Sequence, residues 1–500
     1  MDSALENALN RPLIQRWLYN NPIFFVLCTT MLVTVHLQQL GMGVDSAIYA
    51  CVARNVWENG TWLNPTYTEF DHTPFAEHPP LMFWLQGMIF GIFGATDATA
   101  RLVSIITGVS SVALTYLIGR HIVDERFGFL AALVLMLTVN YLSLCFKTFI
   151  EVLFFFCLLL NLYGLVRGSQ DGRFSYWLIF GIGLGAAFLA KGVVVAGYLL
   201  GLSIFLLFLK KELLLESGFW VGVLVAVLIP ATYLILEATF GQNYFSSYYF
   251  GQQIAGRALY SGGRNYINYT RNLFNLYWPW LPLLIAGIYY AFKQKDLWMR
   301  LLVFILLSYA LFHSISTRLN WQYYANVYVF GAFVSAFAWR QFPRLQFNPE
   351  RFKRIFLPIL TILFIFAQAL PIRFHEMKDA KLLSLTPYAE RIFQTQPRRV
   401  LFTEKALGLW SAPAKMKWYW RAEAKYALTV EELLKEYVKD GRFSFVIIHA
   451  DELSAFLAAA EALHFQALAK SGNLIMAVQG DRFPASGEVF DVSFPKDFFR

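Results

Sequence analysis

Charged residues are scarce in this chain. Asp, Glu, Lys and Arg make up 15% of its 500 residues, whereas a soluble domain carries roughly 25%. Hydrophobic residues make up 57% and aromatic residues 18%, and the mean hydropathy is +0.47. This composition excludes a soluble enzyme, a disordered protein and a collagen-like chain, and it predicts a polytopic membrane protein.

Cysteine is almost absent. The four cysteines, Cys28, Cys51, Cys145 and Cys157, are too few and too dispersed for a disulfide-rich scaffold or a four-thiolate zinc site. A dinucleotide or Walker motif in a strand–turn–helix context is also missing. The net charge of +9 does not predict a nucleic-acid partner, because the basic residues are spread over many short loops.

Apolar stretches recur from residue 23 to residue 372 and then stop. Each is close to the roughly 17–25 residues that cross a bilayer as a helix. The pattern predicts about eleven spans, at residues 23–40, 100–119, 127–146, 150–166, 174–190, 193–209, 219–238, 275–292, 301–316, 321–339 and 355–372. The apolar segment Leu81–Gly94 is short and follows Pro79–Pro80, so we expect an interfacial helix there.

The distribution of Lys and Arg sets the expected orientation. With eleven spans, the segments on the side of the N-terminus hold sixteen of these residues, and the opposite side, before the C-terminal region, holds eight. Cytoplasmic loops carry the excess of positive charge, so the N-terminus is expected in the cytoplasm and the C-terminal region outside. Residues 23–40 lack a small-residue cleavage site and are expected to remain as a span.

Two domains are expected. Residues 1–372 would form the membrane domain, with a first outward loop at 41–99 and a large outward loop at 241–275, and residues 373–500 a small α/β domain. In the first loop, the apolar spacing of Asp45–Gly60 predicts an amphipathic interfacial helix. The C-terminal region suggests strands at Arg399–Thr403, Phe443–His449 and Asn473–Gln479, and helices at Val430–Val438 and Glu452–Leu468.

Ionisable residues gather at the outward ends of the predicted spans. Such groups cost several kcal/mol near bilayer depth unless they are paired or solvated, so they indicate a functional site. The set comprises Asp45, Glu77, His78, Lys147, Glu151, Lys191, Arg257, Arg264, His313 and Arg318. Simpler interpretations remain open: a boundary Lys or Arg can be a snorkelling anchor, and Asp45 can be a helix N-cap.

Taken together, this set suits one kind of chemistry. Converging Arg and Lys side chains bind a phosphate, and they stabilise it as a leaving group. A nearby carboxylate can deprotonate an acceptor hydroxyl. The residues therefore favour glycosyl transfer from a lipid-phosphate donor whose tail stays in the bilayer.

Several motifs occur in a specific order between Gly41 and Arg340. They are Asp45–Tyr49 followed by Trp62–Pro65, Glu77–Trp84 (EHPPLMFW), Phe93–Gly94 followed by Arg101–Leu102, Leu189–Gly192 (LAKG), Tyr248–Arg257, Tyr277–Trp280 (YWPW) and Ser314–Tyr323. In this order and spacing the chain resembles the GT-C glycosyltransferases of the protein O-mannosyltransferase and aminoarabinose-transferase (lipid A) superfamily. The resemblance covers about two-thirds of the chain.

The resemblance implies roles for particular residues. Asp45 would be the catalytic carboxylate, and Glu151 stands where the family often has a second outward-facing acid. His78, Lys191, Arg257, Arg318 and Tyr323 would contact the donor phosphate, and Tyr49, Glu77 and Trp84 would lie in the acceptor and loop region. The family uses polyprenyl-phosphate sugars, binds no nucleotide and generally inverts the anomeric centre. It also implies a bacterial inner membrane location with a periplasmic C-terminal domain.

The chain departs from the family pattern at several positions. His78 replaces the usual Lys, and Gln252–Gln253 stands where some aminoarabinose transferases have a metal-binding Glu-His pair. A divalent metal, with Glu77 as a candidate ligand, is therefore left open, and no other cofactor is expected. The run Ser316–Asn320 departs from the commoner Lys-containing form, which leaves the donor sugar open.

The favoured hypothesis is an integral-membrane glycosyltransferase, transferring a hexosyl or pentosyl group. Its partners would be a polyprenyl-phosphate sugar, membrane lipids, and an outward-facing acceptor that is lipid A, another lipid-linked glycan or a protein hydroxyl. The alternative is a transporter or flippase of lipid-linked sugars, but transporters often show internal repeats and charges near the midplane, and neither is visible here. A non-catalytic scaffold leaves the outward carboxylates and cations without a role.

Overall fold

A computed structural model of the chain describes residues 21–35, 37, 41–70, 74–241, 243–251, 266–314, 320–342, 348–369, 380–407, 412–481 and 490–491. The chain divides into two compact units. The first unit comprises Met1–Gln38, Ala76–Leu85 and Arg101–Ala369, and the second comprises Gln39–Phe75, Gln86–Ala100 and Leu370–Arg500.

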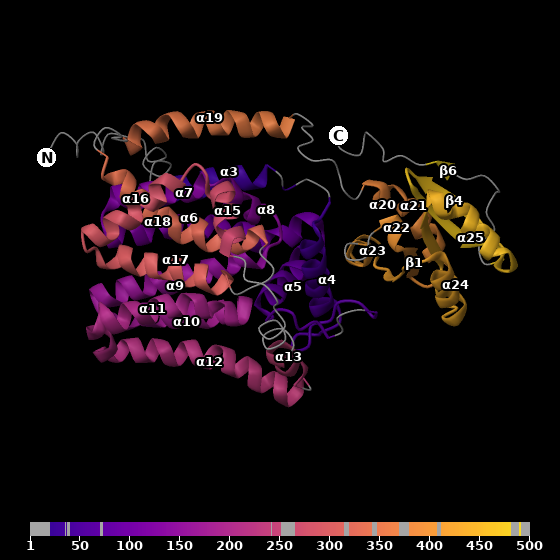
Figure 1. Cartoon of the computed structure of the whole chain (residues 1–500), viewed down its shortest axis with the longest axis horizontal. Helices are drawn as coiled ribbons and strands as arrows, with labels where there is room; N and C mark the ends of the chain where they lie inside the picture. Colours follow the sequence, from indigo (N-terminus) through magenta and orange to yellow (C-terminus); the bar gives the residue numbers. More distant parts are fainter. Residues whose placement is uncertain are drawn as a thin grey trace. The chain divides into compact units, whose positions relative to one another are not determined.

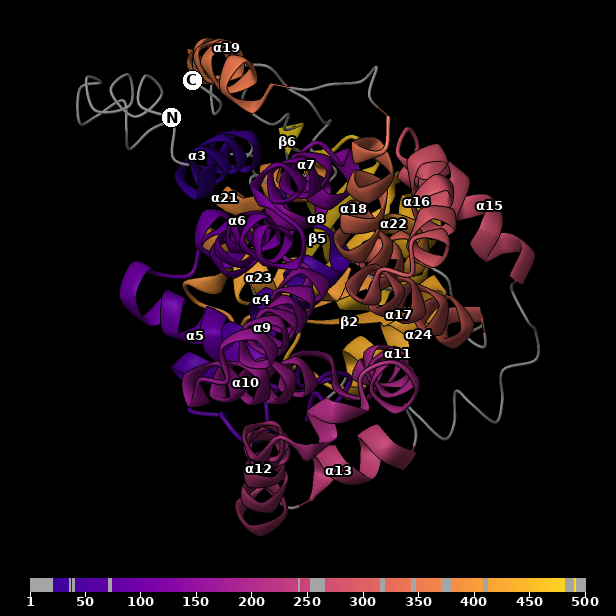
Figure 2. The same ribbon diagram turned by 90° about the vertical axis from the view of Figure 1, so that its left-hand side faces the viewer.

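The first unit is a bundle of helices, most of which run alongside one another (Figure 1) and are seen nearly end-on in Figure 2. Several of them, such as α11, are apolar on every face, as expected for helices that cross a membrane. The helices of this unit are α3 (Asn21–Thr34), α6 (Asp97–Ile122, from Arg101 onward), α7 (Glu125–Met136), α8 (Val139–Phe146), α9 (Ile150–Asp171), α10 (Phe174–Lys191), η1 (Gly192–Val194), α11 (Val195–Phe208), η2 (Lys211–Leu215), α12 (Ser217–Phe240), α13 (Tyr244–Tyr248), α15 (Tyr266–Tyr277), α16 (Leu281–Lys293), α17 (Leu297–Ser314), η4 (Trp321–Tyr324), α18 (Ala325–Arg340) and α19 (Pro349–Ala369).

Among the described residues, five helical stretches are long and apolar enough to cross a membrane, or six if the pair α7 and α8, bent by 66°, counts as one span. They are Asp97–Ile122, Ile150–Asp171, Phe174–Phe208, Ser217–Phe240 and Leu297–Ser314. The predicted class, a helical membrane protein with a small C-terminal α/β domain, is confirmed. The count of eleven spans and their orientation stay predictions.

Helices α9 and α10 pack closely as an antiparallel pair. Gly183 makes this approach possible, because a Cβ there would lie 2.5 Å from the backbone nitrogen of Asn161. The Asn161 side chain donates a hydrogen bond of 2.7 Å to the carbonyl of Phe180 and accepts one of 2.7 Å from the Tyr198 hydroxyl. This register brings the start of α9 beside the end of α10.

The second unit is built on a six-stranded sheet with the strand order β2-β1-β3-β5-β4-β6. Strand β1 pairs in parallel with β2 and β3, β5 runs antiparallel to β3 and β4, and β6 is parallel to β4. The strands are β1 (Arg399–Thr403), β2 (Glu423–Ala427), β3 (Phe445–His449), β4 (Phe465–Ser471), β5 (Leu474–Gln479) and β6 (Phe490–Asp491).

Helices cover both faces of this sheet. Alternate strand residues point to opposite faces, so Phe402 and Ile447 belong to one core and Leu401 and Ile448 to the other. Residues of α20, α21 and α23 complete the first core, and residues of α24 and α25 complete the second. The remaining elements are α4 (Val44–Glu58), α5 (Leu81–Phe93, from Gln86 onward), α20 (Ala380–Ser384), α21 (Thr386–Phe393), α22 (Glu404–Leu407), α23 (Ala412–Trp420), α24 (Val430–Lys439), η6 (Ala450–Glu452), α25 (Leu453–Ala459) and η7 (Glu461–Leu463).

The three predicted strands and the helix at 430–438 are present, as β1, β3, β5 and α24. The predicted helix Glu452–Leu468 is wrong in its second half. Helix α25 ends at Ala459, His464 adopts a left-handed conformation with φ 51°, and β4 begins at Phe465. Pairing of β4 with β5 outweighs the helical propensity of this alanine-rich segment.

The helix predicted at Asp45–Gly60 forms as α4, with Gly43 rather than Asp45 at its N-cap position. Ten of its fifteen residues are buried, and it packs against α23. The sequence-based division placed the whole loop 41–99 in the membrane domain, but Gln39–Phe75 and Gln86–Ala100 group with the C-terminal domain. In the expected large loop 241–275, α13 and most of α15 form, while residues 252–265 lie outside the described residues.

Candidate active site

The first unit contains a buried ion pair at the junction of α9 and α10. The Lys191 ammonium donates to Glu151 Oε1 at 2.7 Å, and the two side chains are only 6% and 4% exposed. Glu151 is the second residue of α9 and Lys191 is the last residue of α10. Each charge therefore lies at the helix end whose dipole stabilises it. Glu151 Oε2 is buried without a hydrogen-bond partner among the described residues.

An aromatic stack lies beside this pair. The Lys191 ammonium is 4.9 Å from the centre of the Tyr323 ring, a cation–π contact. Tyr323 stacks on His313 at 5.5 Å with an interplanar angle of 2°, and His313 stacks on Tyr309 at 5.8 Å. The stack joins the end of α17 to η4. The structure therefore brings together four of the residues singled out from the sequence: Glu151, Lys191, His313 and Tyr323.

A second lysine contacts the same short helix. The ammonium of Lys147, between α8 and α9, lies 4.9 Å from the Trp321 ring. Trp321 also packs edge-to-face against Phe149 at 5.4 Å. Helix η4 is therefore contacted by two lysines: Lys147, which precedes α9, contacts Trp321, and Lys191, at the end of α10, contacts Tyr323. Sequence reasoning did not single out Trp321, although its position two residues before Tyr323 was a usable signal.

The turn after Lys191 has a specific backbone requirement. Gly192 has φ 60° and ψ −130°, and a Cβ at this position would lie 1.9 Å from the Tyr249 hydroxyl. That hydroxyl accepts a hydrogen bond of 3.1 Å from the Val193 amide and donates one of 3.3 Å to the Lys191 carbonyl. Tyr249, which sequence reasoning missed as a site residue, thus fixes the backbone that carries Lys191.

Trp84 is connected to this turn by aromatic contacts. Its ring packs edge-to-face on Tyr233 of α12 at 5.6 Å, and Tyr233 packs on Phe245 of α13 at 5.5 Å. Phe245 in turn stacks on Tyr249 at 5.0 Å. The motif that contains Trp84 is therefore linked through side chains to the backbone of Lys191.

The other predicted site residues have different positions. Glu77 and His78 are partly buried in the same unit, just before Pro79–Pro80. Asp45 and Tyr49 belong to the second unit, where Asp45 is partly buried in the first turn of α4 and Tyr49 is 8% exposed. Arg257 and Arg318, like Arg264 and Gln252–Gln253, lie outside the described residues.

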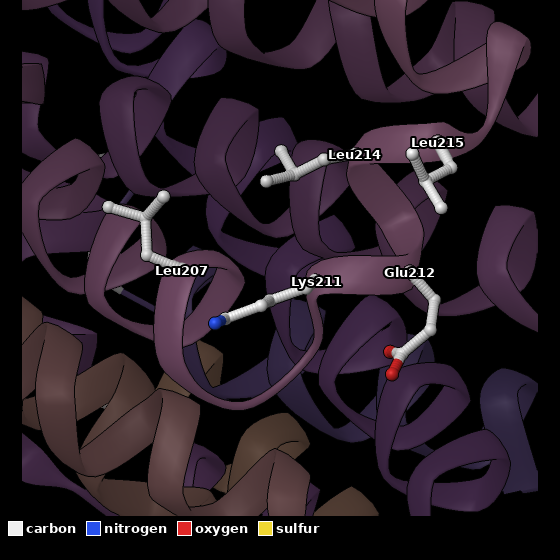
Figure 3. Close-up of a pocket in the computed structure, with 5 residues that line it drawn as sticks. All are labelled: Leu207, Lys211, Glu212, Leu214 and Leu215. Carbon is white, nitrogen blue, oxygen red and sulfur yellow. The ribbon is translucent and has the colours of Figure 1, made fainter.

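Within the described ranges, no group of three or more His, Cys, Asp and Glu side chains is placed to hold a metal ion. A cavity of about 500 Å³ lies at the C-terminal end of α11, lined by Leu207 of that helix and by Lys211, Glu212, Leu214 and Leu215 of η2 (Figure 3). It is at the opposite end of α11 from Lys191, and a helix of this length spans about 21 Å, so it is separate from the ion pair.

The sequence matches known proteins over part of its length. Residues 77–236, which contain Glu77, His78, Trp84, Glu151 and Lys191, match the family described as dolichyl-phosphate-mannose-protein mannosyltransferase. An uncharacterized protein of Aquifex aeolicus is 25% identical over 258 residues, covering 50% of each chain. The undecaprenyl phosphate-alpha-4-amino-4-deoxy-L-arabinose arabinosyl transferase 1 of Pseudomonas fluorescens is 24% identical over 266 residues, covering 50% of this chain and 47% of that protein. The chain thus spans about half the length of these curated relatives.

The fold matches a solved structure over nearly the whole chain. The crystal structure of ArnT from Cupriavidus metallidurans bound to undecaprenyl phosphate is similar with a TM-score of 0.66 and 16% identity, covering 91% of this chain and 97% of that chain. The resemblance to the GT-C glycosyltransferases of the protein O-mannosyltransferase and aminoarabinose-transferase superfamily is confirmed. The fold is that of a GT-C membrane protein.

Proposed function

We propose that this protein is an integral-membrane glycosyltransferase that moves a sugar from a polyprenyl-phosphate carrier to an outward-facing acceptor. The observation that carries the proposal is the buried Glu151–Lys191 pair, which lies inside the segment that matches the mannosyltransferase family. A charged pair at the end of membrane-type helices is costly to bury, and a phosphate-binding role gives a reason for it.

Lys191 would bind the donor phosphate. Its ammonium has three N–H donors, and the contact with Glu151 uses one of them. Glu151 would hold the ammonium in place, and the rings of Tyr323 and His313 would form the wall beside it. His78, Arg257 and Arg318 are proposed as the further phosphate contacts, because cations stabilise the negative charge that develops on the leaving group.

Asp45 would be the catalytic carboxylate. In the proposed step the acceptor hydroxyl oxygen attacks the anomeric carbon, and the bond from that carbon to the phosphate oxygen breaks. The hydroxyl proton passes to the Asp45 carboxylate, and the polyprenyl phosphate leaves with the bonding electron pair. A direct displacement of this kind inverts the anomeric centre. Tyr49, Glu77 and Trp84 are proposed to line the acceptor side.

The partners follow from the relatives. One relative is a transferase of 4-amino-4-deoxy-L-arabinose from undecaprenyl phosphate, and the similar crystal structure holds undecaprenyl phosphate. We therefore propose a bacterial inner-membrane polyprenyl-phosphate pentose or hexose as the donor. The acceptor would be lipid A, another lipid-linked glycan or a protein hydroxyl, reached from the periplasmic side.

The test compares the wild type with Asp45→Asn. Purified full-length protein in detergent is incubated with extracted polyprenyl-phosphate sugars and membrane acceptors, and mass spectrometry follows the transferred sugar. We expect Asp45→Asn to lower the transfer rate by at least about a hundredfold, the usual contribution of a general base. Glu58→Gln is the matched control, because Glu58 is a more exposed carboxylate at the other end of the same helix.

Undiminished transfer by Asp45→Asn would reject the role of Asp45. Binding of the donor lipid without transfer by the wild type, accompanied by its movement across vesicle membranes, would instead favour a flippase.

A further inference from the structure

Helix α4, which carries Asp45, is held by the C-terminal end of α23 in the C-terminal domain. The contact centres on Arg54, which is 5% exposed. Its Nη1 donates to the carbonyl of Trp418 at 3.0 Å, and its Nη2 donates to the carbonyl of Lys417. The guanidinium also lies 5.2 Å from the centre of the Trp418 ring.

The end of α23 is a suitable receptor for this side chain. The last four carbonyls of a helix have no partner within it, and the helix dipole makes this end negative. Arg54 supplies both hydrogen bonds and positive charge to it, from a residue more than 360 positions earlier in the chain. A buried guanidinium is tolerated only with such partners, so the contact fixes the position of α4 against α23.

A second contact lies one turn earlier on α4. The thiol of Cys51 is fully buried and donates to the carbonyl of Ala414 at 3.4 Å. Cys51 and Arg54 are three residues apart, and side chains at that spacing share a face of a helix. The face of α4 that meets α23 is therefore defined by two hydrogen-bonding residues and not only by apolar packing.

The segment before α4 is attached to the same helix. Asp97 accepts a hydrogen bond of 2.7 Å from Trp418 Nε1 and another of 2.9 Å from the Gly41 amide. The Met42 amide donates to the Tyr419 hydroxyl at 3.0 Å. Both the entry to α4 and its middle are thus bound to the end of α23.

From these contacts we infer that Arg54 is a positioning residue, and that the C-terminal domain sets the location of the Asp45 carboxylate through it. The inference rests on the proposed function. Asp45 and Arg54 are nine positions apart on one continuous helix, a distance of about 14 Å. A small tilt at Arg54 therefore displaces Asp45, and an error of about 1 Å at a reacting group can cost a hundredfold in rate.

Cys51 reports on this contact without any measurement of activity. Its burial raises the pKa of its thiol to about 12, so both exposure and thiolate formation depend on separation of α4 from α23. The experiment treats the full-length protein in detergent with a maleimide at pH 7.5 and identifies the modified cysteine by peptide mass spectrometry. The transfer assay is run in parallel, with kcat and the KM for the donor determined separately.

The variants are Arg54→Met, Arg54→Lys and the control Arg421→Met. Arg421 forms an ion pair of 3.0 Å with Glu58, between the same two segments, but its side chain is 59% exposed. For Arg54→Met we expect Cys51 labelling to rise and kcat to fall, each by about tenfold or more, with KM within about threefold. Arg54→Lys should show a smaller rise in Cys51 labelling and a smaller fall in kcat, because its ammonium can donate to one of the two carbonyls. The control should match the wild type.

If Arg54→Met has the same Cys51 labelling and the same kcat as the wild type, the inference is overturned. A rise in labelling with unchanged kcat would also overturn it, because the helix would then be held without affecting the reaction. If the wild type transfers no sugar with any donor, the proposed function fails and the positioning role fails with it. The Cys51 labelling still decides in that case whether Arg54 holds α4 on α23. General unfolding would also lower kcat. It is recognised because it exposes Cys28, Cys145 and Cys157 to labelling as well, and these three cysteines are buried in the folded protein.

Discussion

Burial of Lys191 and Glu151 makes each dependent on the other. Removing two charges from water costs several kcal/mol per ion, and their contact offsets this only while both are present. The second oxygen of Glu151, Oε2, is also buried, and it has no hydrogen-bond partner among the described residues. The pair is thus weak as a source of stability but strong as a constraint on where the ammonium lies.

A double-mutant cycle tests this coupling. We expect Lys191→Met and Glu151→Gln each to lower the free energy of unfolding, by about 3–5 kcal/mol for a variant that leaves an unpaired buried charge. The double variant should lose clearly less than the sum of the two, since neither charge remains. Thermal unfolding of the purified protein in detergent measures the three differences.

The control for this cycle is Arg340→Met. Arg340 pairs with Asp124 at 2.6 Å, but both side chains are more than a third exposed. Such a pair is worth about 0–1 kcal/mol. Strictly additive losses in the Lys191 and Glu151 variants would show that the two residues are not coupled.

At the scale of the element, the turn between α10 and α11 depends on one glycine. Gly192→Ala places a methyl group against the Tyr249 ring and forces an alanine into a backbone conformation that L-residues rarely adopt. We expect this variant to lower the free energy of unfolding by more than the roughly 1–3 kcal/mol of backbone strain alone. Unfolding in detergent measures the loss.

The variant Gly172→Ala separates the cost of backbone strain from the cost of a steric clash with Tyr249. Gly172 also has a positive φ, of 63°, but a Cβ there meets nothing within 4 Å. Its alanine variant should lose only the backbone term, about 1–2 kcal/mol. Equal losses in the two variants would mean that Tyr249 does not pack against Gly192 as described.

The elements that could be predicted from the sequence are those whose pattern is local. Strand β1 is a short run of mostly apolar residues, and helices α24 and α4 show the apolar spacing of a helix. Each forms where it was expected. The segment 452–468 failed because its strand, β4, is specified by pairing with β5, and the alanine-rich sequence itself favours a helix.

The same distinction applies to the candidate site. Glu151 and Lys191 could be singled out because charged residues in apolar stretches are conspicuous. Their pairing could not be predicted, because it depends on the register between α9 and α10 across forty residues. Tyr249 and Trp321 were not singled out, since aromatic residues are common throughout this chain. The nearness of Trp321 to Tyr323 in the sequence was a weak signal, and the contacts of both residues distinguish them in the structure.

For the whole molecule, the division into two units changes how the first outward loop is understood. Sequence reasoning treated the loop as part of the membrane domain. The contacts of α4 with α23 group residues Gln39–Phe75 with the C-terminal domain instead, so the proposed catalytic carboxylate is carried by the same unit as that domain. The buried ion pair belongs to the other unit.

The orientation of the chain in the membrane can be tested with one position after α11 and one position in the C-terminal domain. Lys191 and the pair Lys210–Lys211 lie at opposite ends of α11, so only one end can face the cytoplasm, and the excess of positive charge favours the end with two lysines. Leu215, 87% exposed, follows those lysines, and Leu428, 56% exposed, lies in the C-terminal domain.

We expect Leu428→Cys to react with a membrane-impermeant maleimide in cells whose outer membrane alone is permeabilised. Leu215→Cys should react only after the inner membrane is opened, because the reagent cannot otherwise reach the cytoplasm. Since the four natural cysteines are buried, labelling at the introduced thiol can be assigned by mass spectrometry. The opposite pattern would reverse the topology, and it would contradict the proposal that the acceptor is reached from the periplasmic side.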